Sequence, residues 1–344
     1  MVPRWVLGVV AAAVAVAAVD IAVLVVTRDA RSVTTTAPGA RPVAAADVVA
    51  VIDPATSRVV DRVSVGRTPT IVTAGYGGAW VLNKDDGTLS HLDAHSHHVI
   101  GTMRLDVVAT NLAIGAGGVW FAGRPRGDVH DPLEFARFER IDPATGRVDR
   151  AFDTRTGAFV LAAGGGALWS TGIMAGHVRG AARSDALTGA MRKLDIQSYG
   201  DLIAADDQAA YWVGSVGKRV ARVSARTGLL TKTLPLATDA KLAAGYVGPN
   251  PTAVALGGRA LWISAIDGSL IRVDPDLRRI AASIHVCGNA LAVAYGEGAV
   301  WVACGDATVV RVDPSTNRPG KPIDVGALPR GIAAGDGAVW VTLN

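Results

Sequence analysis

The sequence predicts an all-β protein, a seven-bladed β-propeller that is preceded by one N-terminal transmembrane helix. Two interleaved repeats and one apolar segment support this prediction. Tryptophan recurs every 39 to 50 residues, which is the period of a four-stranded propeller blade. A turn that begins with aspartate alternates with the tryptophans, and an apolar run of 22 residues stands near the N-terminus. The recurring tryptophans are Trp80, Trp120, Trp169, Trp212, Trp262, Trp301 and Trp340.

The N-terminal segment is predicted to be separate from the folded domain. Residues 5–26 are almost all Ala, Val, Leu or Ile, and as a helix they would span about 33 Å, the thickness of a bilayer core. We expect an uncleaved anchor, with residues 1–4 at its cytoplasmic end; a cleaved signal peptide is the alternative. Residues 27–46 are expected to form a disordered linker. The protein is therefore predicted to be a single-pass protein of the cell membrane, with the propeller, residues 47–344, on the extracytoplasmic side.

Each blade is expected to contain four antiparallel strands, named a to d from the centre outward. Each tryptophan follows a Gly-rich turn and lies on strand b, where flanking Val, Ile or Ala residues favour packing between blades over a stacking surface for ligands. The aspartate turn, as in Asp142-Pro143-Ala144-Thr145-Gly146, joins strands c and d. Asp caps such a turn, Pro presets φ, and Gly takes the left-handed conformation.

The order of the two repeats predicts how the ring closes. The first aspartate turn, at Asp53, has no recurring tryptophan before it, and the last tryptophan, Trp340, has no turn after it. We therefore expect residues 47–66 to supply strands c and d of a blade whose strands a and b are formed by residues 327–343. Sharing one blade between the termini pairs edges that would otherwise be free.

Irregular spacings indicate which face carries function. The distance from the turn to the next tryptophan is 27 residues in six blades and 38 in the seventh, and the longer tryptophan-to-turn distances fall in b–c connections. The b–c and d–a connections emerge on the same face, here called the variable face. Because loops carry binding on constant scaffolds, the inserts 123–140, 173–183 and 237–250 are expected to bind a partner protein. Their candidate binding residues are Arg124, Arg126, His130, Asp131, Arg137, His177, Arg179, Lys241 and Tyr246.

A polar ring is predicted at the mouth of the central funnel, where each strand a begins. Such a ring suits a small polar ligand or a peptide terminus, and it equally suits an ordinary water-filled channel. The candidate funnel residues are Thr70, Asn111, Asp201, Thr252, Asn289 and Arg330.

Cysteine and histidine usage gives two further expectations. Cys287 precedes strand a of one blade and Cys304 follows the tryptophan of the same blade, so antiparallel pairing brings them close enough for a disulfide in an exported domain. Four histidines surround one c–d turn and have the composition of a metal site, although a solvated hairpin explains them equally well. These histidines are His91, His95, His97 and His98.

Composition argues against nucleic-acid binding. The 34 basic residues are nearly balanced by 30 acidic residues, for a net charge of +4, and the charges are interspersed rather than gathered on a basic helix. We expect no nucleic-acid partner.

The phrase Pro-x-x-Ile/Val-x-x-Gly-x-Gly-x-x-Trp-Val, followed by Arg-Val/Ile-Asp-Pro-x-Thr-x-Arg-Val, resembles the YVTN and virginiamycin B lyase-like propeller repeat over residues 47–344. The resemblance implies the fold but covers lyases, binding modules and proteins without assigned activity. The streptogramin lyases of this group use histidines and a glutamate with Mg²⁺ at the funnel. Here Thr70, Thr252 and Arg330 follow the strand-starting prolines, and Glu297 falls in an a–b turn, so that machinery has no matching positions.

The sequence therefore favours a binding protein that needs no metal or cofactor, with a protein or a small polar molecule as partner. The alternative is a lyase or hydrolase acting at the funnel, for which Mg²⁺ is the implied cofactor. Its candidate residues are Asp201, Arg330, Asp128, His130, Asp131 and Glu134.

Overall fold

The computed structural model describes residues 47–127, 135–154, 158–174, 178–196, 202–214, 218–236 and 250–344. These residues belong to one compact unit, residues 43–344. The predicted anchor, residues 5–26, and linker, residues 27–46, lie outside them and stay predictions. Within the described ranges, no helix is long and apolar enough to cross a membrane.

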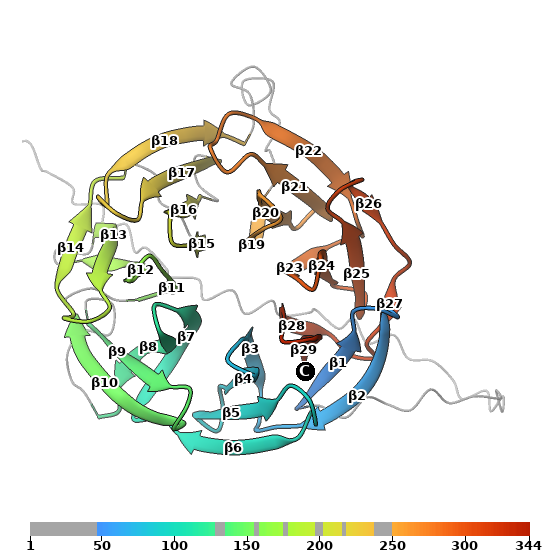
Figure 1. Ribbon diagram of the computed structural model, residues 1–344, viewed down its shortest axis with the longest axis horizontal. Helices are drawn as coiled ribbons and strands as arrows, with labels where there is room; N and C mark the ends of the chain where they lie inside the picture. Colours follow the sequence, from blue (N-terminus) through green and yellow to red (C-terminus); the bar gives the residue numbers. More distant parts are fainter. Residues whose placement is uncertain are drawn as a thin grey trace, which may run out of the picture. The chain divides into compact units, whose positions relative to one another are not determined.

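The described strands form seven antiparallel sheets around a central axis, which confirms the seven-bladed propeller (Figure 1). Strand a of each sheet lies nearest the axis and strand d at the rim. Blade one comprises β3 (Pro69–Ala74), β4 (Gly78–Asn83), β5 (Thr88–Asp93) and β6 (Val99–Arg104); blade two, β7 (Val107–Gly115), β8 (Gly118–Pro125), β9 (Ala136–Asp142) and β10 (Arg147–Thr154); blade three, β11 (Val160–Gly164), β12 (Ala167–Met174), β13 (Val178–Asp185) and β14 (Met191–Leu194).

The remaining blades continue this order. Blade four comprises β15 (Leu202–Ala205), β16 (Ala209–Val213), β17 (Arg219–Ser224) and β18 (Leu230–Pro235); blade five, β19 (Pro251–Gly257), β20 (Ala260–Ala265), β21 (Ser269–Val273) and β22 (Ile280–His285); blade six, β23 (Ala290–Gly296), β24 (Ala299–Cys304), β25 (Thr308–Asp313), and an outer strand in two pieces, β26 (Arg318–Pro319) and β27 (Ile323–Asp324). The last, called the shared blade, joins β28 (Pro329–Gly335) and β29 (Ala338–Leu343) to β1 (Val48–Asp53) and β2 (Arg58–Ser64).

The shared blade closes the ring as predicted. Strand β1 pairs antiparallel with β29, with Val48 opposite Leu343 and Ile52 opposite Val339. Every residue of β29 is buried, because this strand lies between β28 and β1 in the sheet. The two ends of the domain therefore meet inside one sheet.

The seven tryptophans fill the space between neighbouring blades, which confirms their structural role. Each is at most 2% exposed. In several blades a basic side chain on strand c lies opposite the tryptophan: His91 stacks on Trp80 with ring centroids 3.7 Å apart, and Arg272 lies 5.1 Å from the Trp262 ring. The aromatic faces thus pack against both apolar residues and flat cationic or imidazole groups.

The c–d turns have the geometry that the aspartate motif predicts. In the first turn, Asp53 Oδ1 accepts a hydrogen bond from the Ala55 amide at 2.8 Å, and Asp313 Oδ1 does the same for Ser315 at 2.7 Å. Gly146 and Asn317, which end two of the turns, have φ of 65° and 58°. The hydrogen bonds from Ser315 lower the pKa of Asp313 to about 2, so this carboxylate is ionised.

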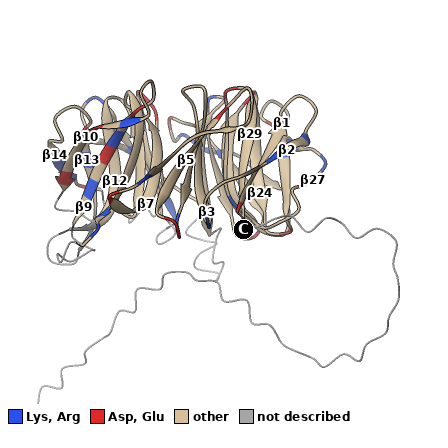
Figure 2. Cartoon of the chain, turned by 90° about the horizontal axis from the view of Figure 1, so that it is seen from below, with Lys and Arg blue, Asp and Glu red and all other residues tan. Residues whose placement is uncertain are grey.

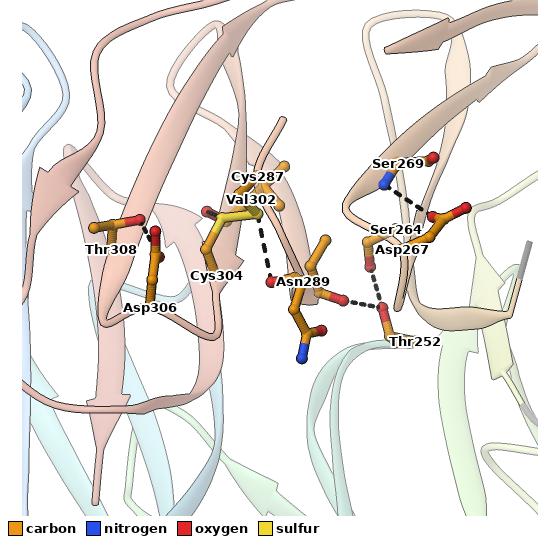
Figure 3. The surroundings of a disulfide bond; sticks show 11 residues. Thr252, Ser264, Asp267, Ser269, Cys287, Asn289, Val302, Cys304, Asp306 and Thr308 are labelled. Atoms are coloured by element: carbon orange, nitrogen blue, oxygen red, sulfur yellow. Dashed lines mark hydrogen bonds between the residues drawn. A yellow bond between two sulfur atoms is a disulfide. The ribbon is translucent and has the colours of Figure 1, made fainter. Parts of the chain in front are cut away.

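A disulfide joins Cys287 to Cys304 in blade six, as predicted, with a Cα–Cα distance of 6.4 Å. Cys304 ends β24 opposite Ala290 of β23. The b–c turn of blade five packs against the same place: Gly268 has φ of 80°, and a Cβ there would lie 1.6 Å from Cys287 O. The bond therefore holds the start of strand a where two blades meet (Figure 3).

Reducing the disulfide is expected to lower the free energy of unfolding by about 3 kcal/mol, because the bond closes a short loop in the unfolded chain across a sequence separation of 17. Urea denaturation of the oxidised and the reduced wild-type protein measures this difference. Equal stability of the two forms would contradict the prediction.

A second prediction concerns His91, whose pKa is lowered by burial and whose Nε2 is buried without a partner among the described residues. As the pH falls below about 6.5, His91 of the unfolded chain binds a proton, whereas His91 of the folded protein stays neutral until a lower pH. The free energy of unfolding should therefore fall from pH 7 downward until the folded protein also binds that proton. His91→Phe should reduce this slope. Denaturation curves of the wild-type protein and of His91→Phe across this pH range test the difference; equal slopes in the two proteins would refute it.

Candidate functional site

The variable face is built differently from the loops that the sequence analysis expected. In blade two, β8 runs on to Pro125, which pairs with Val107 of β7, while the ladder between β8 and β9 ends at Gly123 and Arg137. In blade three, β12 and β13 stay paired as far as Met174 and Val178. Insert 173–183 therefore lengthens the b–c hairpin of blade three, and the start of insert 123–140 lengthens the β7–β8 pair of blade two, because the added backbone groups continue a hydrogen-bonded ladder.

Three of the predicted partner-binding arginines lie on this face in described positions, and two of them already have partners. Arg137 on β9 forms a two-pronged salt bridge with Asp153, with distances of 2.7 and 3.2 Å. Arg126 Nε donates to Leu105 O at 3.0 Å, and Arg124 lies half-buried on β8. Arg126 and Arg137 thus help to hold this edge of blade two together.

Of the other predicted partner-binding residues, Arg179 lies on β13 opposite Ile173. The remaining candidates fall in 128–134, 175–177 and 237–249, outside the described residues: His130, Asp131, His177, Lys241 and Tyr246, together with Asp128 and Glu134.

The funnel mouth is shaped by β-bulges in strand a. In five blades the register between strands a and b slips near the start of strand a, which places one extra residue there. Three predicted funnel residues, Thr70, Thr252 and Arg330, are such extra residues. The sequence analysis missed the bulges, since a bulge adds a residue without leaving a motif.

The bulge threonines use their hydroxyl groups to join strands. Thr252 Oγ1 donates to Ala290 O of the next blade at 2.7 Å and lies 2.8 Å from Ser264 Oγ. Thr70 Oγ1 donates to Leu82 O at 3.5 Å. Each hydroxyl group has one proton, and that proton is already donated to a backbone oxygen. These threonines can therefore only accept a hydrogen bond from a ligand.

Three other funnel residues have polar side-chain atoms that are not used in hydrogen bonds with described residues. Asn111 donates through Nδ2 to Phe159 O at 2.6 Å, and its side-chain oxygen has no donor among the described residues. Asn289 lies between the disulfide and Thr252 (Figure 3), and its Oδ1 is buried without a described partner. Arg330 is exposed and forms no ion pair with another described residue. Asp201, the predicted anion of this ring, lies outside the described residues.

Glu139 on β9 escaped the sequence analysis and is the only buried charged residue among those that the structure describes, at 6% exposure. It lies opposite Phe121 and Ala151, and burial raises the pKa of its carboxyl group. Phe138 and Ile141 lie on opposite faces of β9 and are both buried. The strand is therefore covered on both faces here, which the polar residue at position 139 gave no reason to expect.

The histidine cluster disperses in the structure. His91 stacks between blades, while His97 contacts Trp340 edge-on and lies 3.4 Å from Asp61. His98 Nδ1 lies 2.7 Å from a backbone oxygen of its own turn. Among the described residues, no group of three or more His, Cys, Asp or Glu side chains is arranged to hold a metal ion.

Glu297, the glutamate nearest in sequence to the funnel strand of blade six, lies on the other face. It accepts a hydrogen bond from the Gly337 amide at 3.1 Å and so joins the a–b turns of blade six and the shared blade. This position agrees with the a–b turn expected from the sequence. Glu139 and Glu297 are the glutamates that the structure describes, and Glu297 lies away from the funnel mouth, where the lyase resemblance requires a glutamate.

Comparison with known proteins supports the fold alone. No protein-family model and no curated protein sequence matches the chain. Solved structures match over most of the chain: BamB from Moraxella catarrhalis has a TM-score of 0.52 and 11% identity, covering 79% of this chain and 96% of BamB. The computationally designed Ika8 protein has a TM-score of 0.57 and 15% identity, covering 84% and 87%. The β-propeller domain of Cps50 (Swd1) from Myceliophteria thermophila has a TM-score of 0.59 and 12% identity, covering 81% and 98%. At these identities the likeness establishes a β-propeller, and the finer YVTN or lyase-like assignment stays a prediction.

Proposed function

We propose that this protein is a membrane-tethered, extracytoplasmic β-propeller that binds a partner protein, or a small polar ligand, through its variable face. The observation that carries the proposal is the contrast between the two faces. The a–b turns and c–d turns are short and recur from blade to blade, whereas on the variable face the b–c hairpin of blade three is extended to Met174 and Val178, and strand β8 of blade two runs on to Pro125. A regular scaffold with elongation confined to one face is the usual arrangement of a binding surface.

The funnel residues support the choice of a polar ligand or peptide group at the centre of this face. Arg330 offers an exposed cation, and the side-chain oxygens of Asn111 and Asn289 are without described donors. A carboxylate and an amide group would satisfy these side chains together. A peptide segment carries both groups.

The disulfide supports placement outside the cytoplasm. Disulfides such as Cys287–Cys304 persist in oxidising compartments and are rare in the cytosol. An apolar segment of 22 residues precedes the propeller in the sequence, and its length matches a bilayer core. The proposal joins these two observations: the segment anchors the chain and the propeller stands outside.

Binding through the variable face predicts the result of a loop exchange. Replacing residues 128–134 with a Gly/Ser segment should abolish co-purification of a specific protein from detergent-solubilised native membranes, because the replacement removes the charged part of the longest b–c insert. A matched control replaces residues 143–146, the c–d turn of the same blade on the opposite face, with another turn sequence. The control should retain the partner. Loss in the control but not in the loop variant would contradict the proposal.

Membrane tethering predicts a fractionation result. The full chain should remain in the membrane pellet after alkaline carbonate extraction, whereas a variant lacking residues 1–46 should be recovered in the soluble fraction. Cys287 and Cys304 should resist alkylation in intact cells unless a reductant is added first, since they are paired. Soluble full-length protein with alkylated cysteines would refute the proposed location.

A further inference from the structure

A cavity of about 630 Å³ opens at the rim between blade six and the shared blade, away from the funnel. Residues of β25, β26 and β27 line it on one side, and residues of the c–d turn that leads into β2 line it on the other. These elements are neighbours in the ring (Figure 1). Its volume is within the usual range for small-molecule sites.

The outer strand of blade six is broken where it lines the cavity. Strand β22 of blade five runs without interruption, whereas the corresponding strand of blade six is divided into β26 and β27 by Gly320-Lys321-Pro322. Pro319 still pairs with Val312 of β25, and Gly320 N donates to Arg311 O at 2.8 Å. Pro322 has no N–H to donate, and strand pairing resumes at Ile323.

The cavity is strongly basic. Its lining includes Arg58, Arg311, Arg318 and Lys321, with Asp313 as the acidic residue. None of the four cations forms an ion pair or side-chain hydrogen bond with another described residue. The carboxylate of Asp313 accepts hydrogen bonds from both the amide and the hydroxyl group of Ser315 at 2.7 Å, so it is already engaged in its own turn. Blue segments beside β2 and β27 mark this basic rim (Figure 2).

The equivalent groove between blades five and six contains hydrogen bonds that have no counterpart in the cavity. There, Arg272 occupies the position of Arg311 and donates through Nη1 to Pro314 O at 2.7 Å and to Asn317 Oδ1 at 2.9 Å. In the shared blade, Ser57 stands where Asn317 stands in blade six. Arg311 lies over Trp301 at 5.9 Å, but its Nε is buried without an acceptor among the described residues.

A buried guanidinium nitrogen without an acceptor is costly unless something supplies one. Arg183 of blade three also has an unpaired Nε. In its groove, however, Arg192 reaches the next blade and donates to Thr227 O at 2.6 Å. At blade six the groove is open, and three further cations surround it.

We propose that this cavity binds a small molecule that carries a phosphate group. Guanidinium groups bind phosphate oxygens through paired hydrogen bonds, and a lysine adds a point charge. Four cations against one carboxylate leave an excess of positive charge that suits a phosphate monoester, which carries about two negative charges at neutral pH, better than a single carboxylate. Pro319, Pro322 and Ile323 line the cavity and offer apolar surface to the organic part of the ligand.

Phosphate binding is tested by isothermal titration of the full chain in detergent at low ionic strength, with phenyl phosphate, inorganic phosphate and benzoate as separate probes. Phenyl phosphate should bind most tightly and benzoate most weakly. Arg58→Gln and Lys321→Gln should each weaken phenyl phosphate binding about tenfold, the effect of losing one charged hydrogen bond. Both residues are exposed, so these variants should fold normally, which circular dichroism checks. Arg311→Gln should weaken binding further.

Arg147→Gln is the matched control, because Arg147 holds in blade two the turn position that Arg58 holds in the shared blade, and it is exposed. This variant should bind phenyl phosphate as the wild-type protein does. Phenyl phosphate should also raise the melting temperature of the wild-type protein but not of Arg58→Gln. Equal weakening by Arg58→Gln and Arg147→Gln, or the same affinity for benzoate and phenyl phosphate, would overturn the proposal. Either result would leave partner binding at the variable face untouched.

Discussion

Pairing of β1 with β29 is the interaction on which the rest of the structure depends. A propeller blade buries its faces only against its two neighbours, so an open ring would expose one face at each end. Strand β29 is buried along its whole length between β28 and β1. Closure in turn fixes the spacing between blades, and that spacing decides whether each tryptophan fits its groove.

The basic side chains on strand c connect this packing to the surface chemistry. In blade five, Arg272 lies over its tryptophan and reaches the next turn, so that it closes the groove. In blade one the shorter His91 takes that place, and at the closing blade Arg311 finds no acceptor in the turn it faces. The same position on strand c therefore links two blades through hydrogen bonds in blade five, whereas in blade six it carries a guanidinium group that has no hydrogen-bond partner among the described residues.

Both proposed sites arise where the repeat is irregular. The variable face owes its lengthened strands in blades two and three to residues inserted between strands b and c, whereas the rim cavity lies beside a break in strand d. The polar residues at the regular positions stabilise the scaffold. The bulge threonines donate hydrogen bonds to neighbouring backbone oxygens, and the aspartates cap their own turns.

The sequence by itself determined the number of blades, the shared blade, the burial of the tryptophans, the turn chemistry and the Cys287–Cys304 pair. Each of these follows from local periodicity or from the alternation of two landmarks, and local pattern is preserved on folding. Only the tertiary structure decided that Arg124 and Arg137 lie on strands, that Thr70 and Thr252 are bulge residues, and that Glu139 is buried. It also decided which basic residues meet at the rim. These features depend on the register between strands and on contacts between blades, where residues distant in sequence, such as Arg58 and Arg311, border one cavity. Contacts between residues so far apart in the chain produce no regular spacing in the sequence, so a single sequence does not reveal them.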